Sequence, residues 1–140
     1  MGFAVVGVNY TKSSEGEYPR LVFDVKASIR YLRANAEQYG LDPNRFIAIG
    51  TSSGGTLASL LGTSASVKEL EDLSYGNPEY SSSVQGVVDF CGPSNILALK
   101  EQLNEHVKSD SDRPFSSMSF ASISSKCIDT GTSRTLRPFV

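Results

Sequence analysis

The pentapeptide Gly50-Thr51-Ser52-Ser53-Gly54 is the part of this sequence that could most clearly do chemistry. Its spacing is that of a nucleophile elbow, Gly-x-Ser-x-Gly, in which a serine on a sharp strand-to-helix turn attacks a carbonyl carbon. Such a turn brings the residues on either side of the serine so close together that only small side chains fit, which would explain Gly50 and Gly54. Ser52 is therefore the candidate nucleophile, and a glycine-rich turn without chemistry is the alternative.

The residue after the candidate nucleophile would take part through its backbone. The first N–H groups of a helix have no partner within the helix, and the helix dipole is positive at that end. Both features stabilise the oxyanion that forms when a carbonyl is attacked. We therefore predict that the backbone N–H of Ser53 is an oxyanion donor.

Two nucleotide-binding motifs also place glycines between a strand and a helix. The dinucleotide fingerprint needs glycine where Ser52 stands, and the phosphate loop needs lysine where Thr56 stands. Both motifs therefore fail, and no cofactor is predicted. The two cysteines, Cys91 and Cys127, lie too far apart in the sequence to suggest a metal site, and two free thiols are favoured over one disulfide.

The elements expected around the elbow alternate between strand and helix. Apolar runs at 3–10, 45–50 and 84–91 predict strands. A stripe of apolar residues three and four positions apart predicts a helix over 20–39 that Gly40 caps, and a second helix is expected from Ser53. Strands that alternate with helices form parallel sheets, so the predicted fold class is α/β.

The remaining segments are expected to be short elements and loops. Ser66 and Glu69 have the spacing of a capping box and predict a short helix, while 42–44 predicts a turn and 77–83 a loop. Residues 73–83 are the candidate loop beside a substrate pocket. Asn95 is expected to cap a helix that extends to position 107. The predicted organisation is a core at 1–108 and a serine-rich, irregular tail at 109–140.

Length and charge exclude several classes of protein. A chain of 140 residues has the size of one domain, and a net charge of −2 without a basic run gives no reason to expect nucleic acid or an anionic membrane as partner. No apolar run approaches the ~20 residues that cross a bilayer. The amino-terminal residues do not form a convincing signal peptide, so a cytoplasmic location is expected, unless the true amino terminus lies upstream.

Three pieces of the sequence, at 2–10, 23–55 and 84–95, together resemble the α/β-hydrolase superfamily. The resemblance is strongest to bacterial carboxylesterases related to prolyl oligopeptidases and to acetyl- and feruloyl-type polysaccharide esterases. It implies a partial α/β-hydrolase fold, a three-layer sandwich with a mostly parallel sheet, and a small-molecule or carbohydrate-linked ester as substrate. In that family another strand separates the counterparts of 3–10 and 45–50. Here these two segments must pair directly, leave unpaired strand edges or borrow a strand from another chain, and unpaired edges would favour self-association.

The partners that a catalytic serine requires are harder to find. A histidine must take the serine proton and an acid must orient that histidine, but the only histidine, His106, is expected on a helix rather than at the site. Asp89 is expected to cap a loop or to support the site rather than act as the acid, and Asp24 is expected to be a helix-end charge. Asp24 and Arg45 match recurrent positions of the family that are interpreted as structural. Asp129 lacks the apolar run that precedes the family's acid.

The resulting prediction is a serine carboxylic-ester hydrolase by lineage that acts through an acyl-enzyme. Because neither base nor acid can be recognised, this chain is expected to be incomplete and to have weak or no turnover. The alternative is a non-catalytic remnant or interaction module that retains the hydrolase scaffold.

Overall fold

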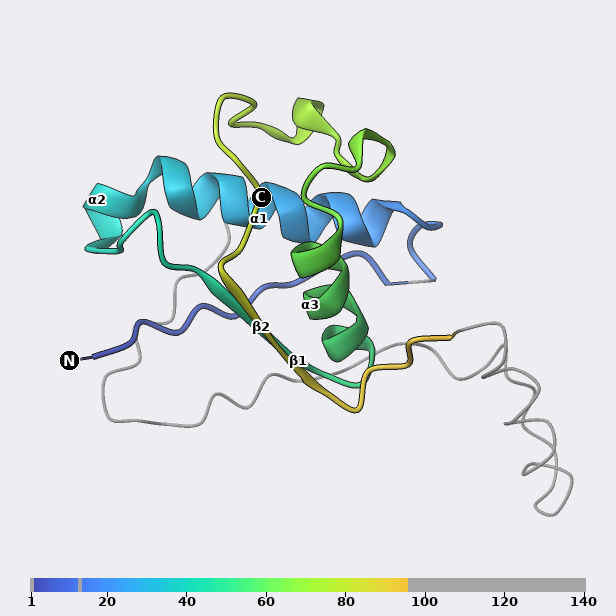
Figure 1. Ribbon diagram of the computed structural model, residues 1–140. Coiled ribbons are helices and arrows are strands. Elements are labelled where there is room, and N and C mark those ends of the chain that lie inside the picture. The colour runs from blue at the N-terminus through green and yellow to red at the C-terminus, as the bar shows by residue number, and fades with distance from the viewer. Residues whose placement is uncertain (1, 13, 96–140) are drawn as a thin grey trace, which may run out of the picture.

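The computed structural model describes residues 2–12 and 14–95 (Figure 1). Among these residues two parallel strands, β1 (Ile47–Thr51) and β2 (Gly86–Phe90), form the sheet, with Ile49 opposite Val88. The elements follow in the order α1 (Arg20–Ala34), α2 (Ala36–Tyr39), β1 (Ile47–Thr51), α3 (Ser53–Thr63), the 3₁₀ helices η1 (Lys68–Leu70) and η2 (Leu73–Tyr75), and β2 (Gly86–Phe90). The order of helices and strands confirms the predicted α/β class, and the strands at 45–50 and 84–91 are confirmed with slightly shifted ends.

The core lies between α1 and α3, on one face of the sheet. Val22, Val25 and Ile29 of α1 pack against Leu57 and Leu61 of α3. The helix α3 runs back along both strands, so that it contacts each of them closely. Burial of these apolar side chains is the main force that holds the helices to the sheet.

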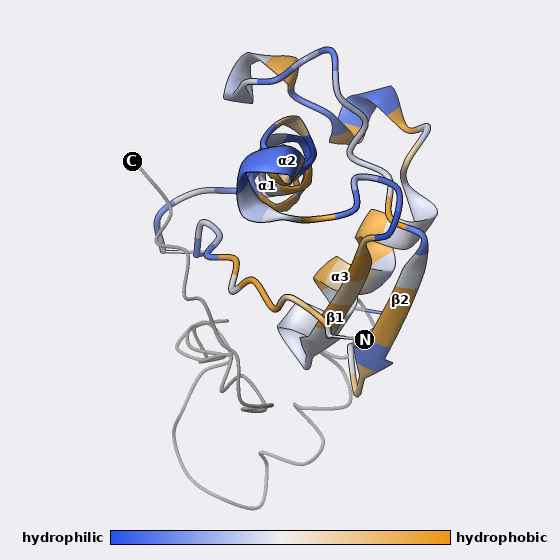
Figure 2. Cartoon of the chain, turned by 90° about the vertical axis from the view of Figure 1, so that its left-hand side faces the viewer, coloured by the Kyte–Doolittle hydropathy of each residue, from blue (hydrophilic) through white to orange (hydrophobic). Residues whose placement is uncertain are grey.

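The opposite face of the sheet is apolar and uncovered within the described residues. Ile47, Ile49 and Phe90 are 56%, 67% and 54% exposed, and Figure 2 shows the apolar colouring of the strands. The described part therefore supplies the sheet and one helical layer of the expected three-layer sandwich.

No helix among the described residues is both long and apolar enough to cross a membrane.

The helix predicted over 20–39 is confirmed, with one interruption. Asn35 separates α1 from the single turn of α2, and Gly40 ends α2 with φ 65°, the left-handed conformation of a carboxyl-terminal cap. The turn at 42–44 is also confirmed, because the side chain of Asp42 accepts a hydrogen bond from the Asn44 N–H at 2.9 Å.

The strand predicted at 3–10 is wrong for the described chain. This segment has no helical turn and no paired strand (Figure 1). A strand requires a neighbour for its backbone hydrogen bonds, and among the described residues this segment has none. Part of its apolar run is exposed, with Phe3 82% exposed, and part of it packs. Val8 and Tyr10 contact the core between α1 and α3.

The capping box predicted at Ser66 and Glu69 is also wrong. The residue that precedes η1 is Val67, and no side chain caps this helix. Asp72 instead caps η2 by accepting a hydrogen bond from the Ser74 N–H. The segment between α3 and β2 forms two single 3₁₀ turns rather than one helix.

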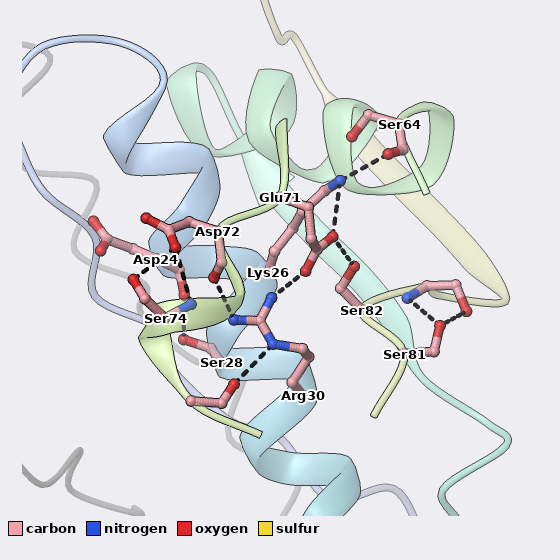
Figure 3. Close-up of polar contacts among 12 residues, drawn as sticks. Asp24, Lys26, Ser28, Arg30, Ser64, Glu71, Asp72, Ser74, Ser81 and Ser82 are labelled. Atoms are coloured by element: carbon pink, nitrogen blue, oxygen red, sulfur yellow. Dashed lines mark hydrogen bonds and ion pairs between the residues drawn. The ribbon is translucent and has the colours of Figure 1, made fainter. Parts of the chain in front are cut away.

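Two buried basic side chains of α1 hold this segment in place (Figure 3). Lys26 donates a hydrogen bond to the Ser64 carbonyl at 2.7 Å and pairs with Glu71 at 3.2 Å. Arg30 pairs with the same carboxylate and donates to the carbonyl groups of Gly76 and Asp72. These contacts define the buried ionic cluster of Lys26, Arg30 and Glu71, which fixes the connection 64–82 against α1.

The loop at 73–83 does not lie beside Ser52, contrary to expectation. Ser52 follows β1, whereas this loop follows the far end of α3 and leads into the beginning of β2 (Figure 1). In a parallel sheet these positions are opposite ends. The residues described end at Asn95, so they do not include the rest of the helix predicted to extend to 107 or the tail at 109–140. The same holds for His106, Cys127 and Asp129.

Candidate active site

Ser52 occupies a strained turn between β1 and α3. Its backbone has φ 55° and ψ −122°, a conformation that non-glycine residues rarely adopt, and its side chain is exposed. The Ser52 N–H donates to the Phe90 carbonyl at 2.8 Å, and the Ser52 carbonyl accepts from the Thr56 N–H at 3.1 Å. Both the end of the sheet and the beginning of α3 therefore hold this residue in its strained conformation, as a nucleophile elbow requires.

The first glycine of the pentapeptide, Gly50, is explained by the same turn. A Cβ atom on Gly50 would lie 2.0 Å from the carbonyl oxygen of Gly54 and 2.7 Å from the Gly55 nitrogen. These contacts are backbone contacts that cannot move aside independently of the helix. The close approach predicted from the Gly-x-Ser-x-Gly spacing is present in the structure.

Ser53 is the first residue of α3 and is almost completely buried, at 8% exposure. At this position its N–H has no acceptor within the helix, so that it is available to an anion. The Ser53 hydroxyl lies 3.2 Å from the hydroxyl of Tyr10. Sequence reasoning missed Tyr10, because nothing local connects two residues that are 43 positions apart.

A second strained residue lies at the same edge of the sheet. Cys91 has φ 55°, is exposed and has a free thiol. Thr51 pairs with Phe90 at the end of the two strands. Ser52 directly follows Thr51, and Cys91 directly follows Phe90, so both residues leave the sheet at the same edge. The signal that could have placed Cys91 here is its position directly after a strand that neighbours β1.

Asp89 holds the chain that leaves β2. Its carboxylate accepts hydrogen bonds from the Gly92 N–H at 2.7 Å and from the Ser59 hydroxyl at 2.8 Å. A Cβ atom on Gly55 would lie 2.2 Å from the Asp89 Oδ1 atom, so the carboxylate packs directly against α3. These contacts confirm the interpretation that Asp89 supports a loop.

Asp24 and Arg45 have structural contacts, although the prediction for Asp24 is wrong in detail. Asp24 lies beyond the first turn of α1 and is not a helix-end charge. Its carboxylate accepts a hydrogen bond from the Thr11 N–H at 2.8 Å, which ties the amino-terminal segment to α1. Arg45 pairs with Asp42 at 2.7 Å, and its side chain is 80% exposed.

An open groove of about 380 Å³ begins one helical turn beyond Ser52. Its lining includes Tyr18, Thr56, Ser59, Leu60 and Pro93. Ser52 itself is not part of its wall. Among the described residues, no group of three or more histidine, cysteine or acidic side chains could hold a metal ion.

The family of the chain is shown by a match over most of its sequence. A sequence model of the BD-FAE family matches residues 1–126. The chain belongs to the BD-FAE family. The BD-FAE match extends over the described residues and into the part of the chain beyond them.

Two curated relatives of this BD-FAE chain are named as ester hydrolases. It is 31% identical over 105 residues to the probable carboxylic ester hydrolase LipM of Mycobacterium tuberculosis, and 31% identical over 112 residues to the esterase LipQ of the same organism. The matches cover 74% and 76% of this chain but only 23% and 26% of the relatives. The chain thus matches about a quarter of the length of these proteins.

Solved structures of related proteins have the same fold in the matched part. A bifunctional GH43-CE protein of Bacteroides eggerthii is 42% identical with a TM-score of 0.56, and the match covers 58% of this chain and 13% of that one. A truncated carbohydrate esterase from gut microbiota is 35% identical with a TM-score of 0.54, over 61% of this chain and 33% of the other. The BD-FAE chain therefore contains part of an α/β-hydrolase fold and is of ester-hydrolase lineage.

Proposed function

We propose that this BD-FAE chain carries the nucleophile and one oxyanion donor of a serine carboxylic-ester hydrolase. The Ser52 Oγ atom forms a bond with the ester carbonyl carbon while its proton passes to a base, and the alcohol leaves with a proton. Water then attacks the acyl-enzyme, which releases the carboxylic acid and restores the hydroxyl. The observation that carries the proposal is the exposed Ser52 at φ 55° at the beginning of α3.

The oxyanion of each tetrahedral intermediate is proposed to bind at the amino-terminal end of α3. The Ser53 N–H has no acceptor within the helix, and the helix dipole adds positive potential at the same point. A fixed donor of this kind stabilises the transition state more than the neutral ester, which is what accelerates the reaction.

The turnover of this chain by itself is proposed to be weak. A serine hydroxyl attacks slowly until a base takes its proton. The single histidine of the sequence, His106, is expected on a helix by its apolar spacing. A base supplied from elsewhere in a longer protein, or by another chain, is therefore part of the proposal.

The substrate class is proposed to be a small-molecule or carbohydrate-linked ester. The names of the related structures, a carbohydrate esterase and a GH43-CE protein, support the carbohydrate-linked form.

The alternative function is an interaction module that associates through its exposed sheet. Within the described part of the chain, Ile47, Ile49 and Phe90 form an exposed apolar face of a kind that soluble monomers rarely leave open. The two strands of that part also have no further strand on either side. Light scattering over a range of concentrations tests self-association, and a strict monomer would contradict it.

Covalent labelling tests the nucleophile without requiring turnover. The chain is incubated with a fluorophosphonate, and the labelled residue is identified by mass spectrometry of peptides. We expect the label on Ser52, no label in Ser52→Ala, and unchanged labelling in Ser66→Ala, which removes an exposed serine of the loop after α3. Labelling that persists in Ser52→Ala would overturn the assignment.

Hydrolysis of p-nitrophenyl acetate tests the proposal of weak turnover. We expect a rate for the purified chain that is close to the rate for Ser52→Ala. A large rate that scales with the chain and disappears in Ser52→Ala would show that the chain contains its own base.

A further inference from the structure

We propose that Tyr10 is a positioning residue for the oxyanion-donating N–H of Ser53. The proposal rests on the function proposed above and adds a residue outside the Gly-x-Ser-x-Gly pentapeptide. Tyr10 and Ser53 lie on separate segments, yet their hydroxyl groups are 3.2 Å apart in a partly buried contact. This is the hydrogen bond from the amino-terminal segment to the first residue of α3.

The contact matters because of where Ser53 lies in its helix. The first residue of a helix is held by its carbonyl group, whereas its N–H has no acceptor in the helix, and helix ends fray. An oxyanion donor acts best when its direction is fixed before the reaction. A hydrogen bond to the Ser53 side chain limits the rotation of this residue and thus the direction of its N–H.

Tyr10 is itself held firmly enough to act in this way. Its ring packs against the core formed by α1 and α3. The next residue, Thr11, donates its N–H to the Asp24 carboxylate of α1 at 2.8 Å. Two adjacent residues of the amino-terminal segment therefore connect α1 to the elbow, one through its backbone and the other through its hydroxyl.

The amino-terminal segment depends on these side-chain contacts for its position. No strand pairs with residues 2–12 among the described residues, so a backbone ladder does not fix the segment. The hydroxyl of Tyr10 accordingly contributes a hydrogen bond to Ser53 that is separate from the apolar packing of the Tyr10 ring. A variant that lacks the hydroxyl but keeps the ring tests this hydrogen bond alone.

The test is the rate at which Ser52 reacts with a p-nitrophenyl organophosphate, followed by release of p-nitrophenol from the 140-residue chain. The transition state carries developing negative charge on the phosphoryl oxygen and therefore depends on the same donor. In Tyr10→Phe we expect a rate constant about three- to tenfold lower than in wild type, in line with the loss of one hydrogen bond. Tyr31→Phe is the matched control, since it removes a hydroxyl bonded to Tyr39 at an exposed site elsewhere.

A double-mutant cycle separates positioning from a general loss of structure. If Tyr10 acts through Ser53, then Ser53→Ala lowers the rate by a similar factor, and the double variant is no slower than either single variant. Rates that fall multiplicatively in the double variant would overturn the proposal. An unchanged rate in Tyr10→Phe would overturn it as well.

Backbone relaxation of the Ser53 amide, measured by ¹⁵N NMR, tests the same link without any chemistry at Ser52. We expect a lower order parameter for this amide in Tyr10→Phe and no change in Tyr31→Phe. If wild type does not react at Ser52 but the order parameter falls as expected, the proposed function fails while the link from Tyr10 to Ser53 holds. An unchanged order parameter would refute the link itself.

Discussion

A side chain on Gly50 would collide with the backbone of Gly54, since a Cβ atom there lies 2.0 Å from the Gly54 carbonyl oxygen. The two glycines are the points at which β1 and α3 come into contact on either side of Ser52. This contact lets the chain reverse direction within one residue. The turn at Ser52 is thus a packing feature of the backbone as well as a sequence pattern.

The Gly50→Ala substitution should destabilise the chain by about 3 kcal/mol or more, because the methyl group would force α3 away from β1. The free energy of unfolding is measured by urea denaturation. Gly40→Ala is a suitable comparison: Gly40 has φ 65°, but a methyl group at this position would have no other atom within 4 Å. There we expect a loss of about 1 kcal/mol from backbone conformation alone. Equal losses in the two variants would argue against the close contact.

The Ser52→Gly substitution should stabilise the chain while it abolishes labelling by fluorophosphonate. Glycine adopts φ 55° without the strain that serine has there, and we expect a gain of about 1 kcal/mol. Thermal unfolding of Ser52→Gly and Ser52→Ala measures the difference, since alanine retains the strain. Ser66→Gly serves as control and should give no gain, because Ser66 is not among the residues with positive φ. A Ser52→Gly variant less stable than Ser52→Ala would contradict the strained turn.

The Glu71→Gln substitution should destabilise the chain strongly. The side chains of Lys26 and Arg30 are completely buried, and the Glu71 carboxylate is their shared counter-charge. Removing one partner of a buried ion pair leaves an uncompensated charge, at a cost of about 3–5 kcal/mol. The midpoint of urea unfolding reports the loss.

The exposed ion pair of Asp42 and Arg45 provides the control for the buried ionic cluster. Asp42→Asn removes a charge from a surface pair whose arginine is 80% exposed, so no measurable change in the unfolding midpoint is expected. Similar midpoints for Glu71→Gln and wild type would show that water compensates the two cations.

Ser74→Ala should raise the pKa of Asp72 toward the ordinary value for aspartate. Hydrogen bonds from the Ser74 hydroxyl and then from its N–H favour the carboxylate and lower this pKa in the folded chain. A lowered pKa contributes stability above the pKa of the unfolded state, and this contribution is lost as the pH falls through the folded-state pKa. The Ser74→Ala variant should therefore lose less stability than wild type as the pH falls.

Carbon-detected NMR titration of the side-chain carboxyl groups measures the shift directly. Asp42 is an internal reference, since its pKa is lowered by the Asn44 N–H and by Arg45 and does not involve Ser74. We expect the Asp72 curve to move and the Asp42 curve to stay. If the Asp72 curve does not move in Ser74→Ala, the hydroxyl does not contribute.

The sequence by itself determined the local features of this protein. The spacing of Gly50, Ser52 and Gly54, the apolar stripe of α1 and the cap at Gly40 depend on neighbours a few positions away. Such short-range chemistry is visible in a linear pattern. The order of strand and helix, and with it the α/β class, follows from these patterns.

Only the tertiary structure decided which distant residues meet. The run at 3–10 has the composition of a strand, but a strand depends on a partner that composition does not name. Lys26 and Arg30 would be expected at the surface, yet Glu71, brought in by a later loop, provides the charge that lets them be buried. The contact between Tyr10 and Ser53 likewise exists only because α1, α3 and the amino-terminal segment share one core. Short-range sequence spacing thus determined the turn at Ser52, and long-range packing determined which residues lie around that turn.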